Sequence, residues 1–74
     1  MPLPKRHRIR GRLEFHERAG PRLVEGSGMA WFLDVDELPA DLIGAAVIVD
    51  GRRSGLTRLE VDYLGLADPQ RNLS

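Results

Sequence analysis

The chain lacks cysteine and carries no net charge, and it has few aromatic residues. The first two absences each exclude a kind of site or attraction. Without cysteine there is no disulfide, no thiolate metal ligand and no thiol nucleophile. The 11 basic and 11 acidic residues balance, so no global field attracts a polyanion. No apolar run approaches the length that spans a bilayer, and the basic N-terminus is not followed by the apolar segment of a signal peptide. We therefore expect a cytoplasmic protein that does not enter a membrane.

The charges are distributed unevenly along the chain. Residues 1–12 carry five basic residues and no acidic one, whereas residues 32–50 carry five acidic residues and no basic one. This separation predicts a molecule with a basic beginning and an acidic middle. The length of 74 residues allows one domain with a small core, because a chain of this size hides only about 60% of the surface that its unfolded form exposes.

Apolar and polar residues alternate with period two through most of the chain, which predicts β-strands with one face in the core. We expect strands that begin at Arg8 and over residues 22–25, 29–35, 46–50 and 56–63. The residues predicted to face the core are Ile9, Gly11, Leu13, Phe15, Trp31, Leu33, Val35, Val47, Val49, Leu59, Val61 and Tyr63. Because a glycine inside a strand marks a bend or bulge, Gly11 predicts a place where the first strand curls.

Residues 38–44 predict a short helix between the third and fourth strands. Asp36 is a candidate N-cap, and Leu38, Leu42 and Ile43 have the helical spacing needed to plug one end of a barrel. A helix at this position in an all-β chain is typical of an OB-like barrel. The predicted fold is therefore all-β with one short helix, in a five-stranded, partly open barrel. An SH3-like barrel, which lacks the full helix, is the alternative.

The composition also predicts how the chain is divided. Residues 1–7 hold two prolines and a run of basic groups and are expected to form a loose arm. Residues 8–66 form the barrel domain. Residues 67–74 form a polar tail that begins near the Asp68-Pro69 pair.

Three stretches of the chain resemble a single family. They are the Gly-Arg-Leu run at residues 11–13, the Trp-Phe-Leu-Asp-Val strand at 31–35, and the run from Leu42 to Asp62. Together they are similar to a group of short bacterial proteins classed as a domain of unknown function with an OB-like barrel. The resemblance extends from residue 8 to residue 64 and implies the fold, but it implies no activity, cofactor or catalytic residue. Leu56 stands where a larger aromatic residue is expected.

The sequence carries no pattern of catalytic residues or of metal ligands. His7 lies in the arm, and His16 lies beside Glu14 and Glu17, which together make a weak ligand set. A solvated turn histidine is the expected role of His16. The chain has no Gly-x-Ser-x-Gly nucleophile elbow, and residues 51–55 lack the lysine and the spacing of a phosphate-binding loop. We therefore expect no enzyme, no metal and no cofactor.

The position of one aromatic residue suggests a surface for single-stranded nucleic acid. OB barrels bind single-stranded nucleic acid across the face of their second and third β-strands. The loop between strands one and two and the loop between strands four and five flank this face. If Trp31 faces the core, then Phe32 faces outward in the middle of that surface, where a base can stack. The candidate nucleic-acid-binding residues are Arg22, Phe32, Arg52 and Arg53. Glu25 and Asp34 lie near the same surface and oppose this interpretation. In the alternative, Phe32 packs under a loop or the tail and the arginines only solvate the turns.

Arg8, Arg10 and Arg12 form a second basic feature, a stripe along the first strand. Three roles are open for the stripe: binding phosphates, guarding the first strand against edge pairing, or pairing with acids on a neighbouring strand or subunit.

The predicted function is a non-catalytic binding module of OB type, with single-stranded nucleic acid as the expected ligand. The alternative is a protein-interaction or self-association module. In that case the basic arm and the acidic middle attract each other between copies, and Phe32, Ile48 and Leu64 provide apolar contact. Fold alone does not choose between these functions.

Overall fold

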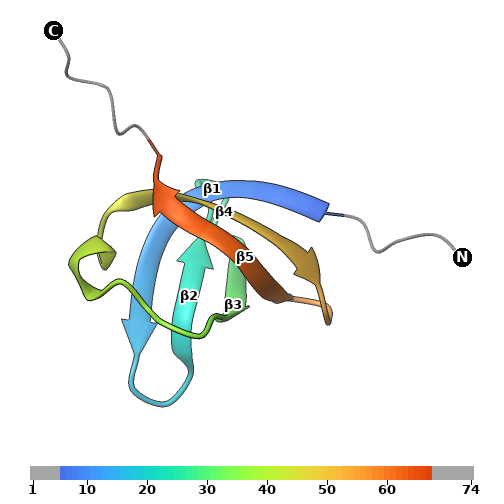
Figure 1. The fold of residues 1–74 in the computed structure, drawn as a ribbon, viewed down its shortest axis with the longest axis horizontal. Helices are drawn as coiled ribbons and strands as arrows, with labels where there is room; N and C mark the ends of the chain where they lie inside the picture. Colours follow the sequence, from blue (N-terminus) through green and yellow to red (C-terminus); the bar gives the residue numbers. More distant parts are fainter. Residues whose placement is uncertain (1–5, 68–74) are drawn as a thin grey trace, which may run out of the picture.

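Five strands close into a single ring in the part of the chain that the computed structural model describes, residues 6–67 (Figure 1). The strands are β1 (Arg6–His16), β2 (Gly20–Val24), β3 (Ala30–Asp34), β4 (Ala46–Arg53) and β5 (Arg58–Leu66). Their order around the ring is β1-β2-β3-β5-β4, and β4 pairs with β1 to close it. The prediction of an all-β, five-stranded, OB-like barrel is confirmed, although the ring is closed rather than partly open.

The strand order also decides against the SH3-like alternative. In a simple meander β4 would lie beside β3, whereas here β5 lies between them and pairs with β3 in parallel. A parallel pair needs a crossover rather than a hairpin, and the chain from β3 through β4 to β5 provides it.

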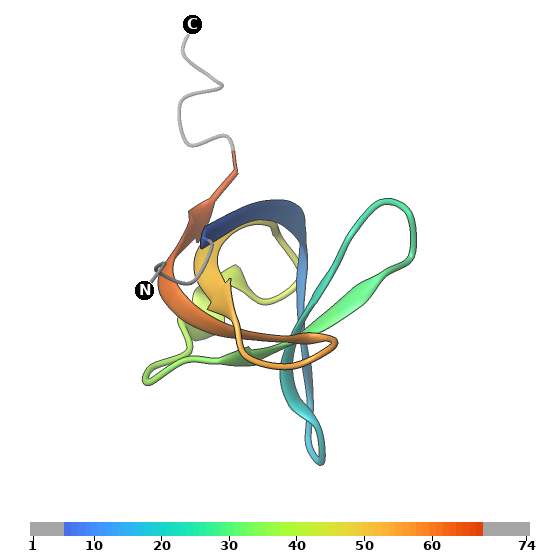
Figure 2. The same cartoon turned by 90° about the vertical axis from the view of Figure 1, so that its right-hand side faces the viewer.

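Strand β1 serves two neighbours in turn. Residues 6–12 pair with β4, and residues 12–16 pair with β2. Gly11 lies where the strand changes partner, and a Cβ atom there would stand 2.5 Å from the carbonyl oxygen of Val24. Because that neighbour is backbone, only glycine allows the two strands to approach this closely. Figure 2 shows β1 curving strongly on its way around the ring, as Gly11 predicts.

The core fills the inside of the ring with side chains from all five strands. The buried residues are Leu13, Leu23, Trp31, Leu33, Val47, Val49 and Leu59, and the partly buried residues packed against them are Ile9, Leu38, Leu42, Val61 and Leu64. The predicted alternation is therefore correct for most of the positions assigned to the core.

Two aromatic residues predicted to face the core are instead exposed. Tyr63 is 56% exposed because Asp50 pairs with Tyr63 while the next residue, Gly51, pairs with Val61. Asp62 is thus the extra residue of a β-bulge, which turns the following side chains to the opposite face. Leu64 packs on the core in place of Tyr63. Phe15, 48% exposed, lies beyond the last core layer, opposite Pro21.

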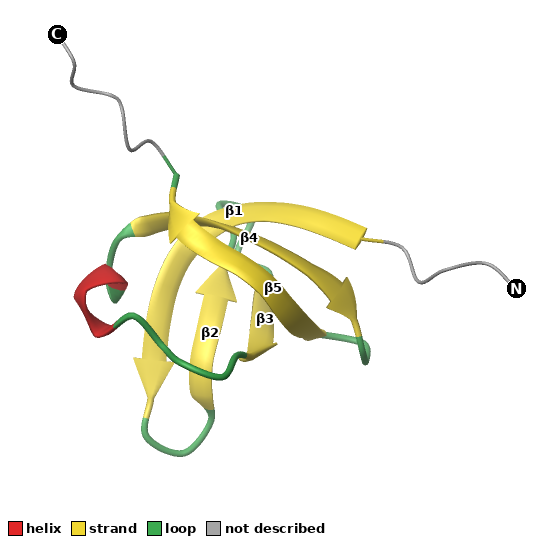
Figure 3. Cartoon of the chain, viewed as in Figure 1, coloured by secondary structure: helices red, strands yellow, loops and turns green. Residues whose placement is uncertain are grey.

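The predicted helix at residues 38–44 is reduced to one 3-10 turn, η1 (Ala40–Leu42) (Figure 3). Pro39 is itself extended, with φ −73° and ψ 98°, and a proline disfavours the helical conformation in the residue before it, so the turn begins only at Ala40. No side chain caps it, which corrects the N-cap role predicted for Asp36. Leu38 and Leu42 pack against the core as expected. Ile43 is 41% exposed and does not help to plug the barrel.

The described residues also bear on the predicted boundaries. Strand β1 already begins at Arg6, where the sequence predicts the end of a loose arm, and β5 ends at Leu66. Residues 1–5 and 68–74 of the predicted arm and tail lie outside the described part. Within residues 6–67 there is no helix of the length and apolar character needed to cross a membrane.

Candidate nucleic-acid interface

A row of four side chains runs across the outside of the barrel. Glu14 pairs with Arg22, Arg22 with Phe32, and Phe32 with Arg58, so the row crosses β1, β2, β3 and β5. Directly opposite residues share one face of a sheet, and the chain neighbours Leu13, Leu23, Trp31 and Leu59 all point into the core. We call Glu14, Arg22, Phe32 and Arg58 the outer row. It places one aromatic ring between two guanidinium groups.

Phe32 holds the middle of this row. Its neighbour Trp31 is 8% exposed and fills the core, so the alternation that predicts an outward Phe32 is correct. Phe32 itself is only partly buried. Its backbone N–H donates to the carbonyl of Thr57 at 2.7 Å, which fixes β3 against the start of β5. The ring therefore stands on rigid strands rather than on a loop.

Arg22 is held on one side by an acid. Its Nη2 lies 3.4 Å from Oε1 of Glu14, and the Nε2 atom of His16 lies at the same distance from that oxygen. These contacts, first from His16 and then from Arg22, hold the pKa of Glu14 below its usual value. Within residues 6–67 the Nε atom of Arg22 is buried and has no hydrogen-bond partner.

Arg58 completes the row, and it is not among the site residues that the sequence predicts. Its Nη1 lies 2.9 Å from Oδ1 of Asp34, and both side chains are about half exposed. Alternation along the fifth strand does place Arg58 outward. What the sequence does not reveal is that β5 pairs with β3, and only this pairing brings Arg58 beside Phe32.

The other two predicted site residues, Arg52 and Arg53, lie outside the outer row. Arg52 points outward from β4 and lies 3.3 Å from Oε1 of Glu60. Arg53 folds back on its own hairpin, where Nε donates to the carbonyl of Gly55 at 3.1 Å and Nη2 to that of Leu56 at 3.2 Å. The Arg53 guanidinium stands 5.9 Å from the centre of the Trp31 ring. The structure therefore unites Arg22 with Phe32 but separates Arg53 from them.

Glu25, which the sequence places near this surface, is occupied elsewhere. Its Oε2 accepts a hydrogen bond of 2.7 Å from Nε1 of Trp31. The pair satisfies the one polar atom of the buried indole, as burial of tryptophan requires. Asp34 remains close to the outer row through its ion pair with Arg58.

The arginine stripe on β1 divides into two parts. Arg8 makes a two-pronged ion pair with Asp50 on β4, with N–O distances of 3.0 and 3.1 Å. This pairing lowers the pKa of Asp50 and raises that of Arg8. Of the three roles left open for the stripe, pairing with acids on a neighbouring strand is the one that Arg8 adopts.

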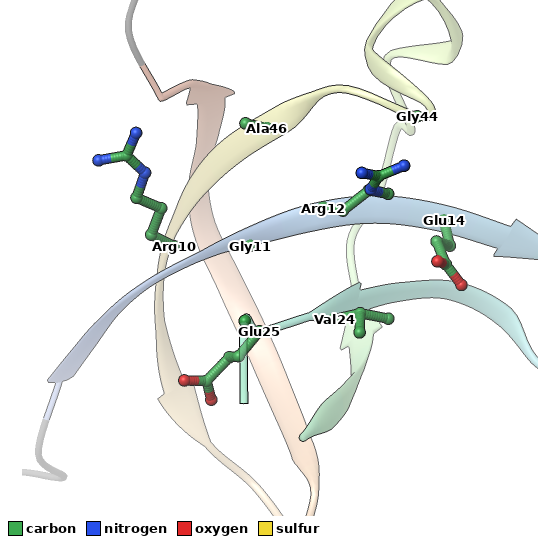
Figure 4. Close-up of a pocket in the computed structure, with 9 residues that line it drawn as sticks. Arg10, Gly11, Arg12, Glu14, Val24, Glu25, Gly44 and Ala46 are labelled. Atoms are coloured by element: carbon green, nitrogen blue, oxygen red, sulfur yellow. The ribbon is translucent and has the colours of Figure 1, made fainter. Parts of the chain in front are cut away.

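Arg10 and Arg12 line a shallow groove where β1 crosses between β4 and β2. Figure 4 shows the two arginines on either side of Gly11, with Glu14 and Glu25 along the β2 side of the same groove. Its lining therefore mixes both signs of charge. Among the described residues no group of three or more histidines, cysteines or carboxylates is placed to hold a metal ion.

Comparison with known proteins adds a family but no activity. A family model described as a protein of unknown function, DUF5818, matches residues 10–67. No curated protein and no solved structure matches the chain. The matched residues include all four members of the outer row.

Proposed function

This chain belongs to the DUF5818 family of proteins of unknown function, and we propose that it is a non-catalytic binding module of OB type whose ligand is single-stranded nucleic acid. The observation that carries the proposal is the position of Phe32 between Arg22 and Arg58 on adjacent strands. A base stacks on the ring, and the two guanidinium groups bind the phosphates on either side.

The ion pairs that hold the two arginines do not oppose such binding strongly. Arg22 pairs with Glu14, and Arg58 with Asp34, in contacts that are partly open to water. Ion pairs of this kind stabilise a protein by only about 0–1 kcal/mol each. A phosphate, which accepts two parallel hydrogen bonds from a guanidinium, competes well with a singly bonded carboxylate.

The size of the row sets the expected strength of binding. Neighbouring strands lie about 4.8 Å apart, so the distance from β2 through β3 to β5 suits one or two nucleotides. Stacking on one ring supplies roughly 1–3 kcal/mol. Two phosphate contacts give a logarithmic salt dependence with a slope of about −1.4 for single strands. We therefore expect weak binding with a shallow salt dependence.

The test is titration of labelled single-stranded oligonucleotides with the protein and with the variants Phe32→Ala and Arg58→Ala. Phe15→Ala is the matched control, because Phe15 is an exposed ring outside the outer row. Loss of binding in both row variants and not in the control supports the proposal. Equal binding by all four proteins contradicts it.

A second candidate function is protein–protein interaction or self-association. It is favoured by the exposed side chains of Tyr63 and Leu66, which line a hollow together with Ile48. Leu64, which the sequence assigns to this role, packs against the core instead. A molecular mass that rises with concentration, and that Tyr63→Ser lowers to the monomer value, would support this candidate.

We also propose a cytoplasmic location, with which the cysteine-free composition is compatible.

A further inference from the structure

A groove opens on the barrel where β3 and β5 stop being neighbours. Their parallel pairing ends at Asp34 and Glu60. Beyond that point β5 continues along β4, whereas the chain after β3 turns away toward η1 (Figure 1). Residues 35–39 form one wall of the groove, and residues 61–64 form the other.

The floor of the groove is apolar. Leu38, Val61 and Leu64 line it, and all three rest against the core. The side chain of Tyr63, which the β-bulge at Asp62 turns outward, adds an exposed ring to the β5 wall. The bulge that removes Tyr63 from the core thus also places its ring at this groove.

The rim of the groove is acidic, with Asp36, Glu37 and Asp62 and no basic residue in the lining. Asp62 already holds a guanidinium group, since its Oδ2 lies 3.3 Å from Nη1 of Arg6. Within residues 6–67, Asp36 and Glu37 form no ion pair. Two carboxylates of the rim are therefore available to basic side chains of a ligand.

One wall also offers the edge of a strand. Apart from the bulge residue Asp62, residues 61–66 of β5 pair with β4 on one side, and β3 pairs with the other side only as far as Glu60. No backbone hydrogen bond of the described chain joins residues 35–39 to residues 61–64. An extended chain laid in the groove can add to this edge as a further strand.

We propose that the groove docks an extended peptide of a partner protein in which apolar and basic residues alternate. Side chains of an added strand point alternately to its two faces. One set then contacts Leu38, Val61 and Leu64, and the other reaches Asp36 and Glu37. The acidic rim repels phosphates, so this site is separate from the outer row and goes beyond the function proposed above.

The probe is a fluorescein-labelled heptapeptide that alternates lysine and valine, titrated by anisotropy at low and at high salt. The protein binds it at low salt, and the double substitution Asp36→Asn with Glu37→Gln weakens binding roughly fivefold to tenfold, as expected for two partly exposed ion pairs. The matched control, Glu17→Gln with Asp41→Asn, removes two exposed acids outside the groove and changes the affinity less than about twofold. A peptide with glutamate in place of lysine does not bind.

Chemical-shift mapping of the same titration locates the peptide. Changes centred on the amides of residues 35–38 and 61–64 support the proposal. Three results overturn it: no binding of the lysine–valine peptide at low salt, an equal loss of binding in the control variant, or shift changes confined to the outer row. A change of the groove amides on adding single-stranded DNA, with none on adding the peptide, also overturns it.

Discussion

Arg22 and Phe32 are direct cross-strand neighbours on the outer surface of β2 and β3, and Glu14 holds the Arg22 guanidinium from the opposite side at 3.4 Å. The carboxylate of Glu14 therefore competes with any phosphate that approaches Arg22. Because the same oxygen also contacts His16, Glu14 links the last residue of β1 to Arg22 on β2.

Replacing Glu14 by glutamine should raise the affinity for single-stranded nucleic acid. The substitution removes a negative charge from the outer row and releases Arg22 from an ion pair of about 0–1 kcal/mol, so we expect a gain of roughly twofold to fivefold at low salt. Oligonucleotide titration measures it. Glu17→Gln removes an exposed acid from the loop outside the row and serves as the control. A weaker affinity for the Glu14 variant would show that this carboxylate helps binding rather than opposing it.

Gly11→Ala should destabilise the barrel strongly. A Cβ atom at this position meets the Val24 carbonyl at 2.5 Å, and backbone cannot move aside as a flexible side chain would. We expect a loss of about 1–3 kcal/mol, the usual cost of overpacking, measured by urea unfolding. Gly26→Ala is the matched control, because a Cβ there meets nothing within 4 Å. Equal stability of the two variants would contradict the close crossing of β1 and β2.

The β-bulge at Asp62 makes a distinct prediction for two leucines. Leu64→Ala should cost about 1–3 kcal/mol because the bulge turns Leu64 onto the core. Leu56→Ala should cost less than about 0.5 kcal/mol, since Leu56 is 82% exposed. Without the bulge, alternation would turn Leu64 outward with Leu66. Thermal or urea unfolding of both variants decides between the two registers.

Stability should fall in acid partly through Asp50. The Arg8 guanidinium lowers the pKa of this carboxyl below its ordinary value of 3.8. A group with a lowered pKa in the folded state stabilises the fold above its unfolded pKa, and this contribution is lost as the pH falls through the folded value. We therefore expect stability to decline below about pH 4, and Asp50→Asn to flatten that decline. Asp41→Asn, an exposed acid with no ion pair within residues 6–67, is the control. An equal flattening by both variants would rule out the Arg8–Asp50 pair as the cause.

Alternation predicts individual strands well and their neighbours poorly. The inward positions of Leu13, Trp31 and Val47 follow from period two. The bulge that turns Tyr63 outward does not follow from period two. It has no signature in the sequence of β5 and depends on the pairing of β5 with Gly51 on β4. Likewise, the sequence does not reveal that Pro39 and Ile43, which flank the 3-10 turn, are both extended and limit the helix to that one turn.

The candidate site shows the same division between local and distant relationships. Alternation along its own strand predicts that Phe32 faces outward, whereas Arg22 is predicted from its place at the loop between the first two strands. Arg58 joins them only through the parallel pairing of β3 with β5, which links strands that are not consecutive. The position of Arg53 at the last hairpin predicts a site residue, yet its guanidinium donates to the carbonyls of that hairpin loop and lies over Trp31. A loop position fixes neither the direction nor the contacts of a long side chain.

Binding at the outer row is best tested by an anisotropy titration of labelled single-stranded DNA and RNA with the wild-type protein, Phe32→Ala and Phe15→Ala at several salt concentrations. We expect weak binding with a logarithmic salt slope of about −1.4. Phe32→Ala should lower the affinity at least about fivefold through lost stacking, and Phe15→Ala should leave it unchanged. Absence of binding at low salt, or equal binding by all three proteins, would contradict the assignment of the outer row as a nucleic-acid-binding surface.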